Sequence, residues 1–178
     1  YYQQAEELVY RLATLKPDES VSAEQLTVYC SAMADEARGA DGNVQGYIAA
    51  ADRYESLGAV MDAPQHTTRL RNKLNILFAD KVREEHEGLR AVQRNGKWGF
   101  ANAEDELVSD FQWDEVKDFA EGFAAVKKDG KWGFIRKDGT LLNAPTYDKV
   151  WSFSEGRARI YAGEHYDYVK TDGSLLLK

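Results

Sequence analysis

The side chains that most often carry enzyme chemistry are few and scattered in this sequence. The three histidines, His66, His86 and His165, lie far apart, and none has a second ligand type at a spacing typical of a metal site. Cys30 is the only cysteine, which excludes a disulfide within the chain and a zinc site of several thiolates. Its helical surroundings favour a small buried thiol over a nucleophile. We therefore predict no catalytic residue, no metal site and no cofactor.

Two other patterns that could suggest chemistry have structural explanations. Gly96-x-x-Gly99 follows no strand that leads into a helix, so it does not fit a phosphate-binding loop. One acidic position recurs through the second half of the chain, at Glu87, Glu121 and Glu155. Because an active site is normally needed once, a repeated carboxylate indicates a structural role, such as holding the turn that follows.

The overall charge and hydropathy restrict the partners. The formal net charge is −7, which argues against nucleic acid or an anionic membrane as the main partner. No apolar run approaches the roughly 20 residues that a membrane span needs, and we expect no membrane insertion. The sequence starts at Tyr1 rather than Met, so we expect a trimmed chain, and its compartment is left open.

The second half of the chain is an internal repeat with a period of 34 residues. Three units cover residues 87–120, 121–154 and 155–178, and each begins with Glu-Gly. The first two units share 13 of 34 residues without a gap, where unrelated sequences would share roughly two. The third unit keeps 7 of 24 positions of the second.

The turn residues predict that each unit is built from antiparallel strands. Asn95-Gly96 and Asp129-Gly130 are typical of two-residue hairpin turns, in which both residues need a positive φ. A hairpin folded at the first turn places Val92 opposite Gly99, and the glycine leaves room for a neighbour to approach closely. The same register is expected one unit later.

The remainder of each unit predicts a short meander. A second turn at Asp138-Gly139 leads to a third strand at Leu141-Leu142, and a loop containing Pro145 follows. A unit of about three strands cannot bury its own aromatic side chains, so it must stack on the next unit. We therefore assign structural roles to the repeated positions Trp98, Gly99, Phe100, Trp132, Gly133 and Phe134.

These units resemble the bacterial WG repeat, also called the KWG repeat. The motifs that carry the resemblance are Lys131-Trp132-Gly133-Phe134, Asp138-Gly139, Tyr147-Asp148 and Phe153-Ser154-Glu155-Gly156. The resemblance covers residues 87–178 and implies an interaction repeat with no activity attached to the family. Glu104-Asp105 departs from the Asp-Gly pattern and suggests a looser turn. Asp167 replaces the glycine of the WG pair, and we expect it to face water on an end unit.

Residues 1–86 change to a helical period. Apolar positions predict four amphipathic helices: one through Ala5–Leu12, one through Leu26–Ala37 after a capping box at Ser22 and Gln25, one over Val44–Leu57 ending at Gly58, and one after Asp62. The pattern from Ala50 to Ala63 resembles the helix junction of tetratricopeptide-like repeats. A plainer interpretation is that Tyr54 and Leu57 are core residues ahead of a glycine cap. Asp80-Lys81-Val82 falls in phase with the last segment of each repeat.

Two aromatic residues depart from the repeat pattern. Trp151 takes a position that holds Lys117 one unit earlier, and lysine is almost never fully buried. Tyr161 likewise takes the position of Lys127. We expect both side chains to be exposed and to be available for contact with a protein or a sugar. The alternative is that they only cover the last unit.

The sequence thus predicts an α+β protein with segregated halves, a helical hairpin array over 1–86 and antiparallel β-hairpin repeats over 87–178. The leading prediction for its function is a non-catalytic module for binding another protein. The alternative is a module that binds cell-envelope glycans through exposed aromatic residues. An enzyme is the third class, and it lacks support because no nucleophile or acid is paired with an activating neighbour.

Overall fold

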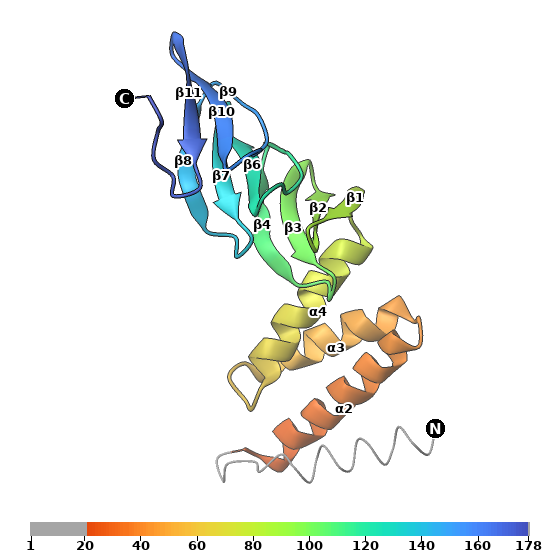
Figure 1. Cartoon of the computed structure of the whole chain (residues 1–178). Helices are drawn as coiled ribbons and strands as arrows, with labels where there is room; N and C mark the ends of the chain where they lie inside the picture. Colours follow the sequence, from red (N-terminus) through yellow and green to blue (C-terminus); the bar gives the residue numbers. More distant parts are fainter. Residues whose placement is uncertain (1–20, 178) are drawn as a thin grey trace. The chain divides into compact units, whose positions relative to one another are not determined.

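The structure is a computed structural model that describes residues 21–177. It forms two compact units that divide between Leu74 and Asn75, and Figure 1 shows helices in the first and strands in the second. The predicted fold class, α+β with helices before antiparallel β-hairpin repeats, is confirmed. The division of the chain at 86/87 follows the sequence repeat and stays a prediction.

The first helix of the described region begins where the capping residues predict. Helix α2 (Ala23–Ala40) starts after Ser22, whose Oγ accepts a hydrogen bond from the Gln25 amide. The Gln25 side chain accepts one from the Ser22 amide in return, which completes the capping box. The helix expected through Ala5–Leu12 lies outside the described residues.

The next two helices also match their predicted bounds. Helix α3 (Val44–Leu57) ends at Gly58, which has a φ of +59° that glycine adopts without strain. Helix α4 (Ala63–Leu77) begins directly after Asp62. The tetratricopeptide-like resemblance stays a prediction.

One apolar core holds the helical unit together. The plainer interpretation of the α3 pattern is confirmed, because Tyr54 and Leu57 are both buried. On α4, Leu70 and Leu74 are buried. The buried members of the cluster are Tyr29, Ala32, Met33, Ala50, Ala51, Tyr54, Leu57, Ala63, Leu70 and Leu74.

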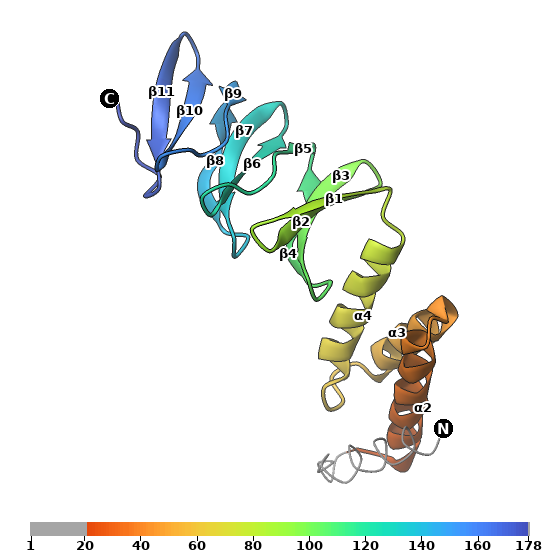
Figure 2. The ribbon, with the colours of Figure 1, turned by 45° about the vertical axis from the view of Figure 1, so that its right-hand side comes forward.

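The strand unit contains three antiparallel sheets, which follow one another in Figure 2. The first sheet consists of β1 (Lys81–His86), β2 (Leu89–Arg94), β3 (Lys97–Asn102) and β4 (Leu107–Trp113). The second consists of β5 (Glu115–Val116), β6 (Phe123–Lys128), β7 (Lys131–Arg136) and β8 (Leu141–Tyr147). The third consists of β9 (Lys149–Val150), β10 (Arg157–Ala162) and β11 (His165–Lys170).

The first two sheets have four strands each, one more than the predicted meander, whereas the third has three. Each sheet takes its first short strand from the segment before its own Glu-Gly pair, as residues 80–82 predict by their phase. The loop expected around Pro145 is wrong, because β8 runs through this residue to Tyr147. Proline is tolerated there because β8 lies at the edge of its sheet.

The predicted hairpin register is confirmed in both complete units. Val92 pairs with Gly99, and the turn residues Asn95 and Gly96 have φ values of +50° and +76°. Strands β6 and β7 repeat the same register. Positive φ at both turn residues matches the twist of the flanking strands.

The glycine of each WG pair makes room for the fourth strand of its sheet. A Cβ at Gly99 would lie 2.6 Å from the backbone oxygen of Ser109, and one at Gly133 would lie 2.5 Å from that of Asn143. Real side chains do not approach backbone atoms so closely, so only glycine fits. The expected close approach is confirmed, and the neighbours are β4 and β8.

Aromatic and aliphatic side chains fill the spaces between successive sheets. One face of the first sheet packs on the second, and the matching face of the second packs on the third. Of the six repeated aromatic positions, five are buried, whereas Trp132 is partly exposed. The five buried ones are Trp98, Phe100, Phe119, Phe134 and Phe153.

Candidate functional site

The repeated glutamates connect each unit to the next. Glu121 accepts hydrogen bonds from two successive amides, Glu155 N at 2.7 Å on Oε1 and Gly156 N at 2.8 Å on Oε2. One unit earlier, Glu87 Oε2 accepts from Gly122 N at 2.9 Å. A structural role is thus confirmed for Glu87 and Glu121, but each holds the Glu-Gly turn of the next unit and not the turn that follows in its own unit.

A second repeated carboxylate holds the lysine of the Lys-Trp-Gly motif. Asp114 forms an ion pair with Lys97, and its other oxygen accepts from the Asp129 amide at 2.9 Å. Asp148 repeats the ion pair with Lys131. The lysine hydrogen bonds hold the pKa of both carboxylates below its ordinary value. The polar motif residues thus have structural partners, and a binding site must use other positions.

The outer face of the third sheet breaks the stacking pattern. In the second sheet, three positions on the stacking face carry Phe123, Ala125 and Phe134, which pack towards the third sheet. One period later these positions carry Arg157, Arg159 and Tyr168. The two arginines are exposed and the tyrosine is partly exposed. Within residues 21–177, this face is therefore a polar and aromatic surface instead of a packing surface.

Arg159 lies at the centre of a group of aromatic rings on this face. Its guanidinium carbon is 4.0 Å from the ring centroid of Tyr166 and 5.0 Å from that of Trp151. The Tyr161 ring lies 4.8 Å from Tyr166. We call these four residues the Arg159 cluster. Two of its members, Trp151 and Tyr161, were predicted from the sequence. The other two, Arg159 and Tyr166, were not, and they connect the predicted pair.

The exposure of the predicted residues differs. Trp151 is 41% exposed, as expected, whereas Tyr161 is only partly exposed because it packs against Tyr166. Tyr166 is 47% exposed. It lies directly opposite Tyr161 in the β10–β11 pairing, so hairpin register was the signal that could have found it.

An open groove of about 580 Å³ runs beside the cluster. Its lining includes Trp151 and three cationic residues, Lys117, Arg157 and Arg159. The acidic residue in the lining, Glu155, lies 3.4 Å from Arg157. In the described part of the chain, Arg159 and Lys117 have no ion-pair partner. The groove thus combines aromatic surface with unneutralised positive charge.

The comparison with protein families identifies the strand unit. The family described as WG containing repeat matches residues 98–132 and 132–163. The chain contains WG repeats. The matched segments run from one WG tryptophan towards the next, so they divide the 34-residue period at a different point from units that begin at Glu-Gly. Neither the curated proteins nor the solved structures gave a match.

The second turn of a WG unit lies on the preceding unit, which explains its glycine. A Cβ at Gly139 would fall 1.8 Å from the backbone oxygen of Val108 in β4. The first WG unit carries Asp105 at this position, with a φ of +63°. The expectation of a looser turn is wrong, because the same two backbone hydrogen bonds close both turns.

The aspartate that replaces the WG glycine in the third repeat unit is buried. Asp167 is 1% exposed, so the expectation that it faces water is wrong. Its Oδ1 accepts hydrogen bonds from the amides of Tyr168 at 2.6 Å and Leu177 at 2.8 Å. The carboxylate therefore accepts a hydrogen bond from Leu177, in the segment that follows β11. Burial, with a smaller contribution from Asp167, raises the pKa of Tyr147.

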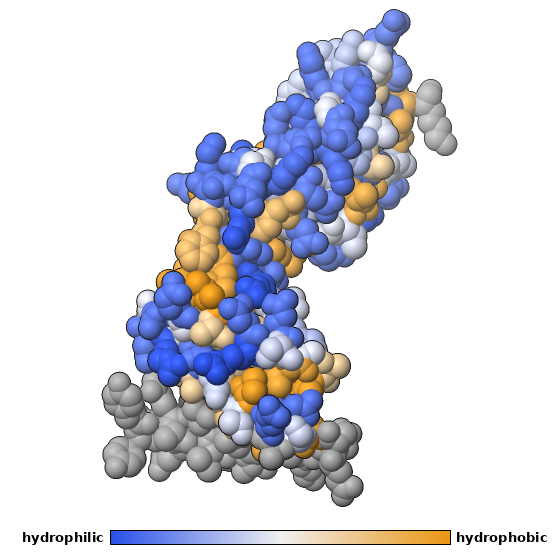
Figure 3. Space-filling model, turned by 180° about the vertical axis from the view of Figure 1, so that it is seen from behind, coloured by the Kyte–Doolittle hydropathy of each residue, from blue (hydrophilic) through white to orange (hydrophobic). Residues whose placement is uncertain are grey.

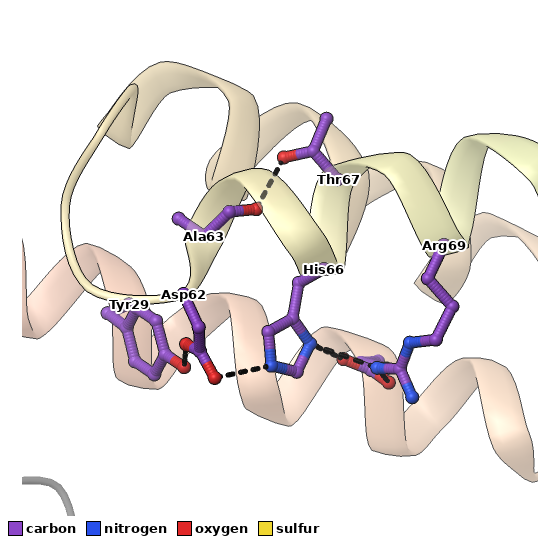
Figure 4. A network of polar contacts seen from close by, with 7 residues as sticks. Tyr29, Asp62, Ala63, His66, Thr67 and Arg69 are labelled. Atoms are coloured by element: carbon purple, nitrogen blue, oxygen red, sulfur yellow. Dashed lines mark hydrogen bonds and ion pairs between the residues drawn. The ribbon is translucent and has the colours of Figure 1, made fainter.

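His66 lies in a polar network inside the helical unit (Figure 4). Its side chain is 8% exposed, with Nδ1 3.1 Å from Glu36 Oε2 and Nε2 3.4 Å from Asp62 Oδ2. Tyr29 donates a hydrogen bond to Asp62, and Arg69 forms an ion pair with Glu36. Sequence spacing did not indicate this network, because Glu36 lies on α2 and His66 on α4.

The network links all three described helices. The His66 ring stacks on Tyr54 of α3, with ring centroids 4.6 Å apart. Burial acts to raise the pKa of Asp62, but the hydrogen bond from Tyr29 and the nearby His66 outweigh it, and the pKa is lowered. Since His66 is nearly closed to solvent, the arrangement fits helix packing better than chemistry on a substrate.

The remaining candidates are not brought together. His86 and His165 are exposed on β1 and β11, and Cys30 is partly exposed on α2. Residues 21–177 hold no group of three potential metal ligands. No helix among them is long and apolar enough to span a bilayer. Seen from behind, the strand unit is mostly hydrophilic, with small separate hydrophobic areas (Figure 3).

Proposed function

We propose that this chain is a non-catalytic interaction module whose WG units present the outer face of the third sheet to another protein. One observation carries the proposal: positions that pack one WG unit on the next hold Arg157, Arg159 and Tyr168 in the third unit. Selection for stacking alone would favour apolar residues there, as in the second unit. Residues that leave such a face accessible are suited to contact with a partner.

The composition of the face supports a protein partner. Tryptophan, tyrosine and arginine are the residue types enriched at the energetic centres of protein interfaces. The Arg159 cluster contains all three types within one group of contacting side chains. The helical unit would offer a second contact surface, as its tetratricopeptide-like pattern implies.

A glycan-binding module is the alternative. Aromatic rings that keep one face open can stack on sugar rings. Trp151, which follows β9, and Tyr166 on β11 are the most exposed aromatic residues on the outer face of the third sheet, and Trp151 lines the groove. These two features favour a glycan as the second candidate ligand.

A comparison of captured ligands tests the proposal. The full chain and its Trp151→Lys variant would be used in parallel to capture proteins from a bacterial lysate and to bind a panel of cell-envelope polysaccharides. Proteins retained by the original chain and lost with the variant would support the proposal. Retention of a polysaccharide alone would favour the alternative. Turnover of a substrate that disappears on changing one carboxylate would contradict the non-catalytic assignment.

A further inference from the structure

We infer that the outer face of the third sheet binds an acidic segment of a partner protein, with Arg159 as the central contact to its carboxylates. This inference rests on the proposed function and adds the chemistry of the partner. It follows from the position of Arg159, from the charges around it, and from the way in which the aromatic rings are occupied.

The rings hold the Arg159 guanidinium in place. Its carbon lies within 5.0 Å of the ring centroids of both Trp151 and Tyr166, a geometry in which cation–π attraction stabilises the side chain. A guanidinium that lies over a ring still has N–H groups at its edge that can donate hydrogen bonds. These donors match the two oxygens of a carboxylate. Because the side chain is already ordered, binding costs less conformational entropy.

The charges on this face favour an anionic partner. Arg159 and Lys117 have no ion-pair partner in the described part of the chain, and Lys149 on the neighbouring strand has none either. The acidic residue in the groove, Glu155, is paired with Arg157, and its side chain is 81% exposed, so it does not neutralise Arg159. The whole chain carries −7, so a general attraction for anions is not expected. Any preference for acidic ligands must therefore be local.

The arrangement of the rings favours a peptide over a sugar. The Arg159 guanidinium covers one face of both Trp151 and Tyr166, which reduces the ring surface on which a sugar could stack. These rings are also inclined to each other by 52°, so they do not form one flat platform. Carboxylates of a peptide can bind Arg159 without displacing it from the rings.

Fluorescence anisotropy with two short peptides tests the inference. One probe is a peptide rich in glutamate and aspartate, and the other has glutamine and asparagine at the same positions with the same neutral dye. We expect the full chain to bind the acidic probe at least about tenfold more tightly at low salt, and we expect the difference to shrink at high salt. Arg159→Glu should remove most of this preference, and Arg159→Lys should reduce it because lysine lacks the planar fork.

Lys81→Glu provides the matched control. It makes the same change of charge on β1, where Lys81 is exposed, and should change affinity for the acidic probe less than about twofold. Equal binding of both probes, or equal effects of Arg159→Glu and Lys81→Glu, would overturn the inference. If Arg159→Glu unfolds the unit, Arg159→Gln is used instead, and it too should remove most of the preference for the acidic probe.

The outcome also separates this inference from the proposed function. Suppose that Trp151→Lys releases a captured protein while the acidic probe does not bind. The interaction module would then stand, and the acidic partner would be wrong. Binding of an acidic polysaccharide without binding of the acidic peptide would overturn both.

Discussion

The contact between WG units can be tested at one glutamate with an internal control. Glu121→Ala removes a carboxylate that accepts the amides of Glu155 and Gly156 in the next unit, at 2.7 and 2.8 Å. Glu155→Ala removes the residue at the same repeat position in the last unit, where the side chain is 81% exposed. Both residues have a left-handed backbone, with φ of 51° and 53°, so backbone effects of the two substitutions cancel in the comparison.

The expected cost of Glu121→Ala follows from the two hydrogen bonds. A hydrogen bond contributes about 0.5–1.5 kcal/mol net, and more when the acceptor is charged, although solvent exposure reduces the gain. We expect a loss of about 2 kcal/mol in the free energy of unfolding. For a unit of this size, each kcal/mol lowers Tm by about 4–8 °C. Glu155→Ala should stay within about 0.5 kcal/mol of the original chain.

Tryptophan fluorescence is a suitable assay, because all 4 tryptophans lie in the strand unit. Urea unfolding of the full chain followed at this signal therefore reports on the WG repeats alone. The midpoint should fall for Glu121→Ala and stay unchanged for Glu155→Ala. Equal midpoints for the two variants would show that the carboxylate does not connect the units.

Three further predictions concern other positions. Gly139→Ala should destabilise the strand unit by about 3 kcal/mol or more in urea unfolding, because its Cβ would lie 1.8 Å from a backbone oxygen of β4. Asp105→Ala at the same turn position should cost less, about 1 kcal/mol, because it removes a partly buried ion pair with Arg90 but creates no clash. Tyr29→Phe removes a hydrogen bond that lowers the pKa of Asp62. At neutral pH the variant should be less stable than the original chain by at most about 1 kcal/mol, because the Asp62 carboxylate is half-exposed. Unfolding followed by circular dichroism should show this difference disappear as pH falls through the folded-state pKa of Asp62. Trp151→Lys should leave the melting temperature nearly unchanged; a loss of several kcal/mol would show that its side chain belongs to the core.

The local features of the fold could be predicted because each depends on a few neighbouring residues. The hairpin register follows from a two-residue turn, and the helix bounds follow from caps at Ser22 and Gly58. A structural role for Glu121 followed from its recurrence, whereas its contact with the next unit did not. In these cases the determinant lies within a few residues of its effect, or is repeated along the chain.

The features that were predicted wrongly or missed depend on residues far away in the sequence or on the position of a strand in its sheet. Asp167 was expected at the surface, but it is buried, and its carboxylate accepts the amide of Leu177, ten residues later. The proline at 145 suggested a loop, but its edge position in the sheet makes it harmless. One partner of His66, Glu36, lies on a helix 30 residues earlier. Local pattern contains no information on such contacts.

A triple substitution can test whether the polar residues on the outer face of the third sheet prevent it from stacking on another sheet. Arg157→Phe, Arg159→Ala and Tyr168→Phe together give the third sheet the residues of the second, which pack against a neighbouring sheet. In the full chain this would expose a new apolar face and remove two charges, so we expect association of the triple variant to rise with concentration.

Sedimentation velocity over a range of concentrations measures this association. The matched control is a triple variant with serine at the same positions, which removes the charges without adding apolar surface. We expect only the apolar variant to sediment faster than the original chain as concentration rises. If neither variant associates, the residues at these three positions are not what prevents the third sheet from stacking on another sheet. The arginines would then need another reason for their place there.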